Sequence, residues 1–112
     1  MKFAIPTNNG NLCLHFGHCE VFTFIEIDET TKTILSKEEI TPPAHQPGIL
    51  PPWVAKHGAK VIIAGGMGMR AQQLFAEQGI KVIVGAGEGN PEKLVLEYLA
   101  GTLETGANIC DH

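Results

Sequence analysis

This chain of 112 residues lacks the features that define several large classes of protein. Only eight residues are Lys or Arg, they form no run, and the net charge is −4, which argues against nucleic acid as a partner. No apolar stretch approaches the roughly 20 residues that cross a bilayer, and no signal peptide precedes the first predicted strand. We therefore expect a cytoplasmic protein whose three cysteines stay reduced. In that compartment, neighbouring cysteines indicate a metal or catalytic site more often than a disulfide.

The residues that are present suffice for one folded domain. Hydrophobic residues make up 44% of the chain and the mean hydropathy is +0.07, so a core can be buried. We place the domain at residues 1–101 and a C-terminal tail at residues 102–112.

Soft metal ligands are concentrated in two short segments at opposite ends of the chain. Two thiols and two imidazoles share the seven residues 13–19, CLHFGHC, and the chain ends on Cys-Asp-His. Taken singly, each cysteine is equally well explained as a small core residue, and each histidine as a surface residue. Together they favour a zinc, copper or iron–sulfur site that folding closes. The candidate metal ligands are Cys13, His15, His18, Cys19, Cys110 and His112.

The predicted elements follow a β-β-β-α-β-α-β-α order. Runs of β-branched and aromatic residues predict strands, and prolines mark the starts of two helices. The predicted strands are 2–6, 21–28, 33–40, 60–64 and 81–84, and the predicted helices begin near Pro51, after Gly68 and at Pro91. Strands 60–64 and 81–84 are expected to be buried. Residues 7–11 are expected to form a loop. Residues 42–52 hold five of the seven prolines and are expected to form an extended connection.

The element order predicts a mixed α/β sheet. No helix separates the first three strands, so they should form an antiparallel meander, and right-handed crossovers place 60–64 beside 2–6. The expected strand order is 33–40, 21–28, 2–6, 60–64, 81–84, with 21–28 antiparallel and helices on both faces. The loops 7–20, 42–52, 65–68 and 85–90 then leave one edge, where open α/β sheets bind ligands.

One of these loops is rich in glycine. Residues 66–71 resemble the Gly-x-Gly-x-x-Ala turn that binds dinucleotides, and Glu88 follows at a suitable spacing. Two βα units are too few for a dinucleotide fold, and a tight turn for helix–sheet packing explains the glycines equally well. A third possibility is that the N–H groups of this turn bind an anionic cluster instead of a dinucleotide. The candidate cofactor-binding residues are Gly65, Gly66, Met67 and Gly68.

Signals of catalysis are absent from the sequence. It shows no Ser/His/Asp arrangement, no paired carboxylates, no His-Glu-x-x-His motif and no zinc-finger spacing. We therefore expect a binding protein and not an enzyme. The alternatives are a zinc-binding or nucleotide-using enzyme built on the turn at 65–68, and a structural zinc module. His45 is expected as an exposed loop residue or an extra ligand, and His57 as a helix cap.

Two motifs carry a resemblance to a known family. His15-Phe16-Gly17-His18 and the turn 63–68, IAGGMG, resemble the dinitrogenase iron–molybdenum cofactor biosynthesis family, which includes NifX-like proteins and the C-terminal domain of NifB. The resemblance covers nearly the whole chain and implies a ribonuclease H-like, three-layer α/β/α fold. It also implies a protein that carries an iron–sulfur or molybdenum–iron–sulfur cluster between donor and acceptor proteins, without turnover. His15 is the ligand that the His-Phe-Gly motif implies, and the Cys-Asp-His ending resembles a Cys-rich subgroup.

The tail must reverse direction to bring its ligands to the site. The last helix should finish at the opposite edge of the sheet, about 17 Å away for a five-residue strand. Residues 102–109 can span up to about 26 Å when extended. We expect the tail to run back along the domain, or to reach a partner chain in a homodimer that shares the cluster, and to be tied down through Cys110.

Overall fold

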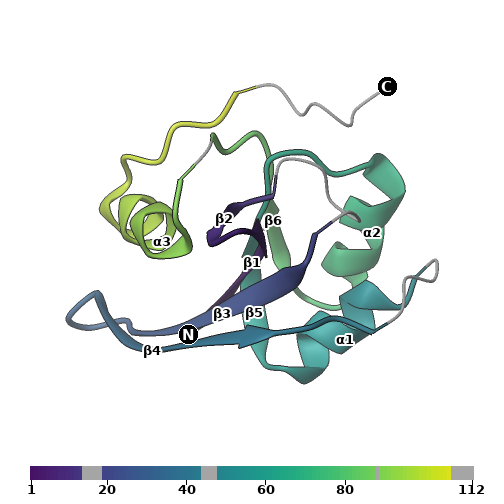
Figure 1. Ribbon diagram of the computed structural model, residues 1–112, viewed down its shortest axis with the longest axis horizontal. Helices are drawn as coiled ribbons and strands as arrows, with labels where there is room; N and C mark the ends of the chain where they lie inside the picture. The colour runs from purple at the N-terminus through teal and green to yellow at the C-terminus, as the bar shows by residue number, and fades with distance from the viewer. Residues whose placement is uncertain (14–18, 44–47, 88, 107–112) are drawn as a thin grey trace.

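The computed structural model describes residues 1–13, 19–43, 48–87 and 89–106, and all structural statements below concern these residues. A central sheet is covered by helices on both faces, so the predicted mixed α/β class is confirmed (Figure 1). The strands are β1 (Lys2–Asn8), β2 (Asn11–Leu12), β3 (Val21–Asp28), β4 (Thr33–Ile40), β5 (Ala59–Ile63) and β6 (Lys81–Ile83). The helices are α1 (Leu50–Lys56), α2 (Met69–Glu77) and α3 (Pro91–Ala100).

β1 lies in the middle of the sheet. The strand order is β4-β3-β1-β5-β6, with β2 paired to β1 beside this path. β3 runs antiparallel to both β1 and β4, whereas β1 and β5, and β5 and β6, are parallel. The carboxyl ends of β1, β5 and β6 therefore meet the amino end of β3 at one edge of the sheet.

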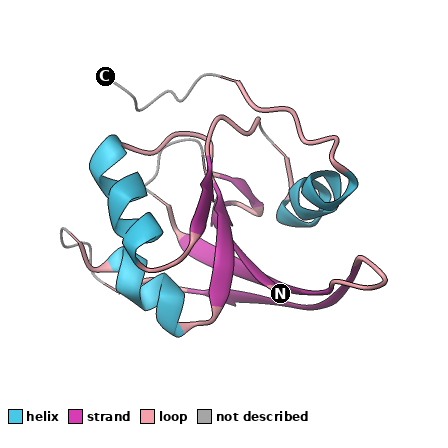
Figure 2. Ribbon diagram, turned by 180° about the vertical axis from the view of Figure 1, so that it is seen from behind, coloured by secondary structure: helices cyan, strands magenta, loops and turns pink. Residues whose placement is uncertain are grey.

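The sheet separates two apolar cores, because successive side chains of a strand point to opposite faces. Ala4, Phe22, Phe24 and Ile62 face α1 and α2, where they pack with Val54 and Phe75. Their neighbours along the strands face α3; these are Phe3, Ile5, Ile25, Ile27, Val61 and Ile63. Figure 2 shows α3 alone on its side of the sheet. Burial on both faces explains why β1 and β3 read as continuous apolar runs.

Two local predictions need correction. Residues 7–11 were expected to be a loop, but β1 continues to Asn8 and turns through Asn9 (φ 53°) and Gly10 (φ 80°) into β2. Positive φ at both positions is the requirement of a tight hairpin turn, which Asn-Gly satisfies best. Residues 81–84 were expected to be buried, but β6 is an edge strand and is only half-buried.

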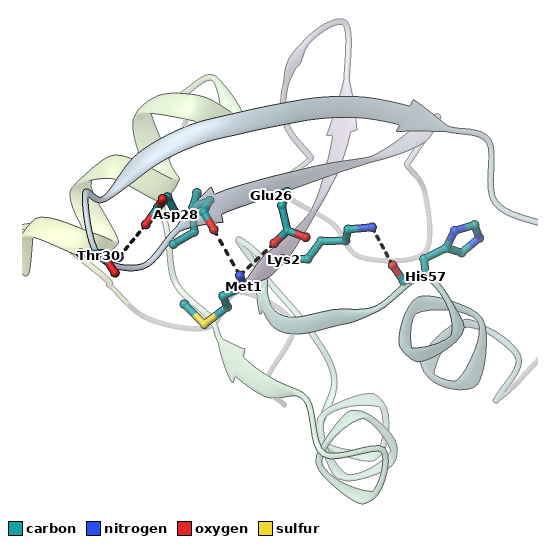
Figure 3. Close-up of polar contacts among 7 residues, drawn as sticks. Met1, Lys2, Glu26, Asp28, Thr30 and His57 are labelled. Atoms are coloured by element: carbon teal, nitrogen blue, oxygen red, sulfur yellow. Dashed lines mark hydrogen bonds and ion pairs between the residues drawn. The ribbon is translucent and has the colours of Figure 1, made fainter.

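Polar contacts close the opposite end of the sheet, far from the loops described below (Figure 3). The amino group of Met1 lies 2.8 Å from Glu26 Oε2 and donates to the Ile27 carbonyl at 3.2 Å. Its hydrogen bond to Glu26 lowers the pKa of that carboxyl below its usual value. Lys2 Nζ donates to the carbonyl of His57 at 3.0 Å, and His57 is the C-cap of α1, as predicted.

No helix among the described residues is long and apolar enough to cross a membrane.

Candidate metal centre

The hairpin of β1 and β2 fixes the position of Cys13. Leu12 donates its N–H to the carbonyl of Gly89 at 2.9 Å, and Cys13 donates to the carbonyl of Pro6 at 2.8 Å. Cys13 is only 4% exposed. Its backbone is therefore held by two parts of the domain, independently of any bond that its sulfur makes.

Asn8 joins this hairpin to the chain that enters β3. Its Oδ1 accepts the Glu20 N–H at 2.6 Å, and the Glu20 side chain accepts the Asn9 N–H at 2.9 Å. Asn8 Nδ2 donates to Cys13 Sγ at 3.5 Å. One amide thus contacts both ends of the segment 13–19, the sulfur of Cys13 and the backbone just after Cys19.

Neither Asn8 nor Glu20 was predicted as a site residue. The Asn9-Gly10 hairpin signal could have indicated that Asn8 ends a strand beside the cluster.

The structure joins Cys13 and Cys19 by a disulfide, with 5.7 Å between their Cα atoms. This differs from the expectation of two reduced thiols, which rested on the inferred compartment and not on geometry. The hairpin holds the backbone at Cys13, and the contact of Asn8 with Glu20 holds the backbone beside Cys19. Together they bring the two cysteines close enough to form a disulfide. A pair of sulfurs held this close can, when reduced, ligate one metal ion or one cluster.

The remaining predicted ligands, His15, His18, Cys110 and His112, lie outside the described residues, as do His45 and Glu88. Within the described ranges, no group of three or more His, Cys, Asp or Glu side chains is arranged to hold a metal ion. The described part of the predicted site is therefore the cysteine pair alone.

The glycine-rich turn lies at the same edge, between β5 and α2. Gly65 accepts the N–H of Gly85 at 2.8 Å, and Gly68 is the N-cap of α2. Met67 is fully buried in the core beneath α1 and α2, and its carbonyl accepts from Gln72 at 2.8 Å. The Met67 side chain thus packs in the core, while the backbone of the turn remains at the edge with its neighbours Gly65, Gly66 and Gly68.

The first part of the tail returns toward this edge. Gly101 ends α3 with φ 75°, and Leu103 packs against the α3 core. Thr105 then forms an antiparallel bridge with Ala86, and Gly106 donates its N–H to the carbonyl of Gly85 at 2.7 Å. The backbone approaches so closely that a Cβ on Gly85 would overlap the Gly106 carbonyl. Residues 102–106 therefore run back along the domain, and residues 107–112 lie outside the described ranges.

A cavity opens beside Cys19, and no sequence signal indicated it. Its volume is about 240 Å³, and it lies between the start of β3, the end of β4 and the start of α1. We name it the Cys19 pocket. Its lining residues are Cys19, Glu20, Phe22, Thr41, Pro42, Pro43 and Leu50.

The geometry defines a mixed α/β domain with a paired-cysteine segment at the ligand edge of its sheet. Residues 1–101 match the family described as dinitrogenase iron–molybdenum cofactor. The chain belongs to this family.

Individual relatives are similar over nearly the whole chain. The uncharacterised protein MJ0580 of Methanocaldococcus jannaschii is 33% identical over 109 residues, covering 93% of this chain and 90% of its own. The crystal structure of PH0822 is 29% identical, with a TM-score of 0.86 and 96% of each chain covered. The apo form of the orange protein of Desulfovibrio gigas is 25% identical, with a TM-score of 0.71, covering 96% of this chain and 93% of the other.

Proposed function

We propose that the protein binds a metal–sulfur cluster, iron–sulfur or molybdenum–iron–sulfur, as a cargo that it carries without turnover. The observation that carries the proposal is the Cys13–Cys19 pair at the ligand edge of the sheet. The family to which the chain belongs is associated by description with the iron–molybdenum cofactor, and that association supports a cofactor-related role.

The chemistry of the described residues fits such a cargo. Thiolates are the ligands that iron–sulfur clusters select, and they are preferred by soft metals in general. The Asn8 amide donates to Cys13 Sγ, and hydrogen bonds to ligand sulfurs tune the charge and potential of clusters. Hydrogen bonds also hold the backbone at Cys13 and at Glu20, the neighbour of Cys19, so the sulfurs should stay close when they are reduced.

The rest of the ligand set is part of the same proposal. His15, His18, Cys110 and His112 are the proposed additional ligands, and the backbone at Gly65, Gly66 and Gly68 is the proposed contact for the anionic face of the cargo. Residues 102–106 run toward this edge, which supports a contribution from the chain that follows them. We also propose a ribonuclease H-like fold, a cytoplasmic location, and donor and acceptor proteins as partners, with a homodimer as an alternative way to share the cluster.

Reconstitution of the reduced protein tests the ligand assignment. The full chain is reduced under anaerobic conditions and offered iron and sulfide, with and without molybdate. Bound metal and acid-labile sulfide are then measured after desalting. Cys13→Ser and Cys19→Ser should each abolish most of the binding while the reduced protein still folds, because serine is close to cysteine in size and a hydroxyl at position 13 can keep the hydrogen bond from Asn8 Nδ2.

Asn11→Ser is the matched control, because Asn11 is an exposed residue of the same hairpin. It should bind as much cluster as the unchanged chain. Full binding by both cysteine variants would overturn the proposal, as would a reduced, unchanged chain that retains neither iron nor sulfide.

A further inference from the structure

We propose that Cys13 and Cys19 form a thiol–disulfide exchange site, in which a small neutral or cationic thiol enters the Cys19 pocket and attacks Cys19 Sγ. The exchange determines whether the two sulfurs are available as metal ligands. This last consequence rests on the proposed function, whereas the exchange itself does not.

The two cysteine residues differ in burial. Cys13 is 4% exposed and its backbone is part of the hairpin, whereas Cys19 is only partly buried and lines the Cys19 pocket. Exchange requires a thiolate to reach one sulfur of the disulfide, and the sulfur that is attacked decides which cysteine leaves. Access from the pocket therefore selects Cys19 as the sulfur attacked and Cys13 as the leaving group.

The environment of Cys13 suits a leaving sulfur. When the disulfide opens, negative charge develops on Cys13 Sγ, which already accepts a hydrogen bond from Asn8 Nδ2 at 3.5 Å. A donor placed where charge develops lowers the barrier of a step, because it needs no reorganisation. Two hydrogen bonds do not involve the sulfurs: the Cys13 N–H donates to the Pro6 carbonyl, and the Glu20 N–H donates to Asn8 Oδ1. These bonds keep the two cysteines close after reduction and favour closure of the disulfide again.

The size of the pocket and its charge indicate the class of thiol. At about 240 Å³ it is smaller than the about 300–1,000 Å³ of common small-molecule sites, so it suits a small thiol. Pro42, Pro43 and Leu50 form apolar walls, and Glu20 places a carboxylate at the site. That carboxylate repels an anionic thiol and attracts a cationic one. The expected effect of one charge across a few ångströms of water is about threefold in rate.

The reaction balances without a further reactant. A thiolate attacks Cys19 Sγ, the Cys13–Cys19 bond breaks, and its electron pair goes to Cys13 Sγ, which leaves a mixed disulfide on Cys19. A second thiolate attacks the small-molecule sulfur of that mixed disulfide and releases the Cys19 thiolate. Two thiols are oxidised to one small disulfide, the protein disulfide is reduced to two thiols, and two protons pass from the small thiols to the cysteines.

Reduction of the oxidised, metal-free full chain by three thiols tests the exchange. Cysteamine is cationic, 2-mercaptoethanol is neutral and 3-mercaptopropionate is anionic. For each thiol, the rate for Glu20→Gln is divided by the rate for the unchanged chain, which cancels the reactivity of the thiol itself. Gln at position 20 keeps an acceptor for the Asn9 N–H, so the local hydrogen bond is preserved. We expect the ratio to fall below one for cysteamine, to stay near one for 2-mercaptoethanol, and to rise about threefold for 3-mercaptopropionate.

Mass spectrometry of the acid-quenched reaction locates the mixed disulfide. Fragmentation distinguishes all three cysteines, and we expect the adduct on Cys19 at least ten times as often as on Cys13. An adduct mainly on Cys13, or an equal Glu20→Gln ratio for all three thiols, would overturn the proposal. Reduction that proceeds only with a dithiol protein such as a thioredoxin would also overturn it.

Cluster reconstitution of the oxidised and reduced chains separates this proposal from the proposed function. Binding by the reduced chain alone supports both. Equal binding by both forms, with the disulfide still intact in the oxidised chain, refutes the cysteine pair as ligands and with it the proposed function, but leaves the exchange site standing. Binding by neither form, with exchange intact, refutes the carrier function and leaves the exchange site standing.

Discussion

Replacing Gly85 by Ala should separate the contribution of the tail from that of the domain. Gly85 has φ +82°, and a Cβ at this position would overlap the carbonyl of Gly106. The left-handed conformation costs a non-glycine residue about 1–2 kcal/mol. Displacing the tail removes the Gly106–Gly85 hydrogen bond, which belongs to the bridge of Thr105 to Ala86 and is worth about 0.5–1.5 kcal/mol. The expected loss is therefore about 1.5–3.5 kcal/mol in the free energy of unfolding.

Gly87 provides the matched control in the same loop. A Cβ at Gly87 meets nothing within 4 Å and the residue is exposed, so Gly87→Ala should change stability by less than about 1 kcal/mol. Urea unfolding of both variants, with the tail present and with residues 102–112 deleted, measures the contact. In the shortened chain, Gly85→Ala should keep only its conformational cost of about 1–2 kcal/mol. An equal cost with and without the tail would refute the docking of residues 102–106 as a source of stability.

Three further predictions concern the frame around the site. Thr7 and Thr23 are fully buried and share a hydrogen bond of 3.0 Å, and Thr7 also donates to Val21 O. Thr7→Val should cost about 1–3 kcal/mol in urea unfolding, because it leaves the Thr23 hydroxyl unsatisfied, and Thr23→Val should cost less; the reverse order would contradict the assigned donor direction. Asn90→Ala should cost about 1 kcal/mol in thermal unfolding, because Asn90 Oδ1 accepts the Lys93 N–H at the start of α3; an unchanged midpoint would argue against the cap. Deleting residues 109–112 should weaken metal binding in a titration with little change in melting of the metal-free chain, and unchanged affinity would show that the tail supplies no ligand.

Much of the fold follows from patterns that are local in the sequence. The β3 and β4 strands begin and end at the predicted residues because polar turns flank them, and Asn90-Pro91 and Gly101 mark both ends of α3. The hairpin into β2 was missed although Asn9-Gly10 is a strong turn signal, since two residues of β2 are too few to show a strand pattern. The exposure of β6 depends on its place at the edge of the sheet, which its apolar residues do not reveal.

The candidate site was predictable in its residue types but not in its contacts. The sequence indicated Cys13 and Cys19 as two of six candidate metal ligands, and the glycine turn at 65–68 at the same edge. The Asn8 amide reaches Cys13 and Glu20 only because β1 extends past its apolar part and turns back. The Cys19 pocket needs residues from β3, the end of β4 and α1, which the sheet brings together. Such non-local contacts depend on the tertiary structure, and short-range periodicity does not report them.

The most direct test of the proposed cluster binding is the metal and sulfide content of the protein as it leaves the cell. The full chain is purified without oxygen, and its metals and acid-labile sulfide are measured per chain together with its absorption spectrum. We expect iron, with or without molybdenum, in company with sulfide, and a visible absorption that is lost in Cys13→Ser and Cys19→Ser but kept in Asn11→Ser. Zinc without sulfide, or a colourless chain that remains metal-free under reducing conditions, would contradict the proposal that the protein binds a metal–sulfur cluster.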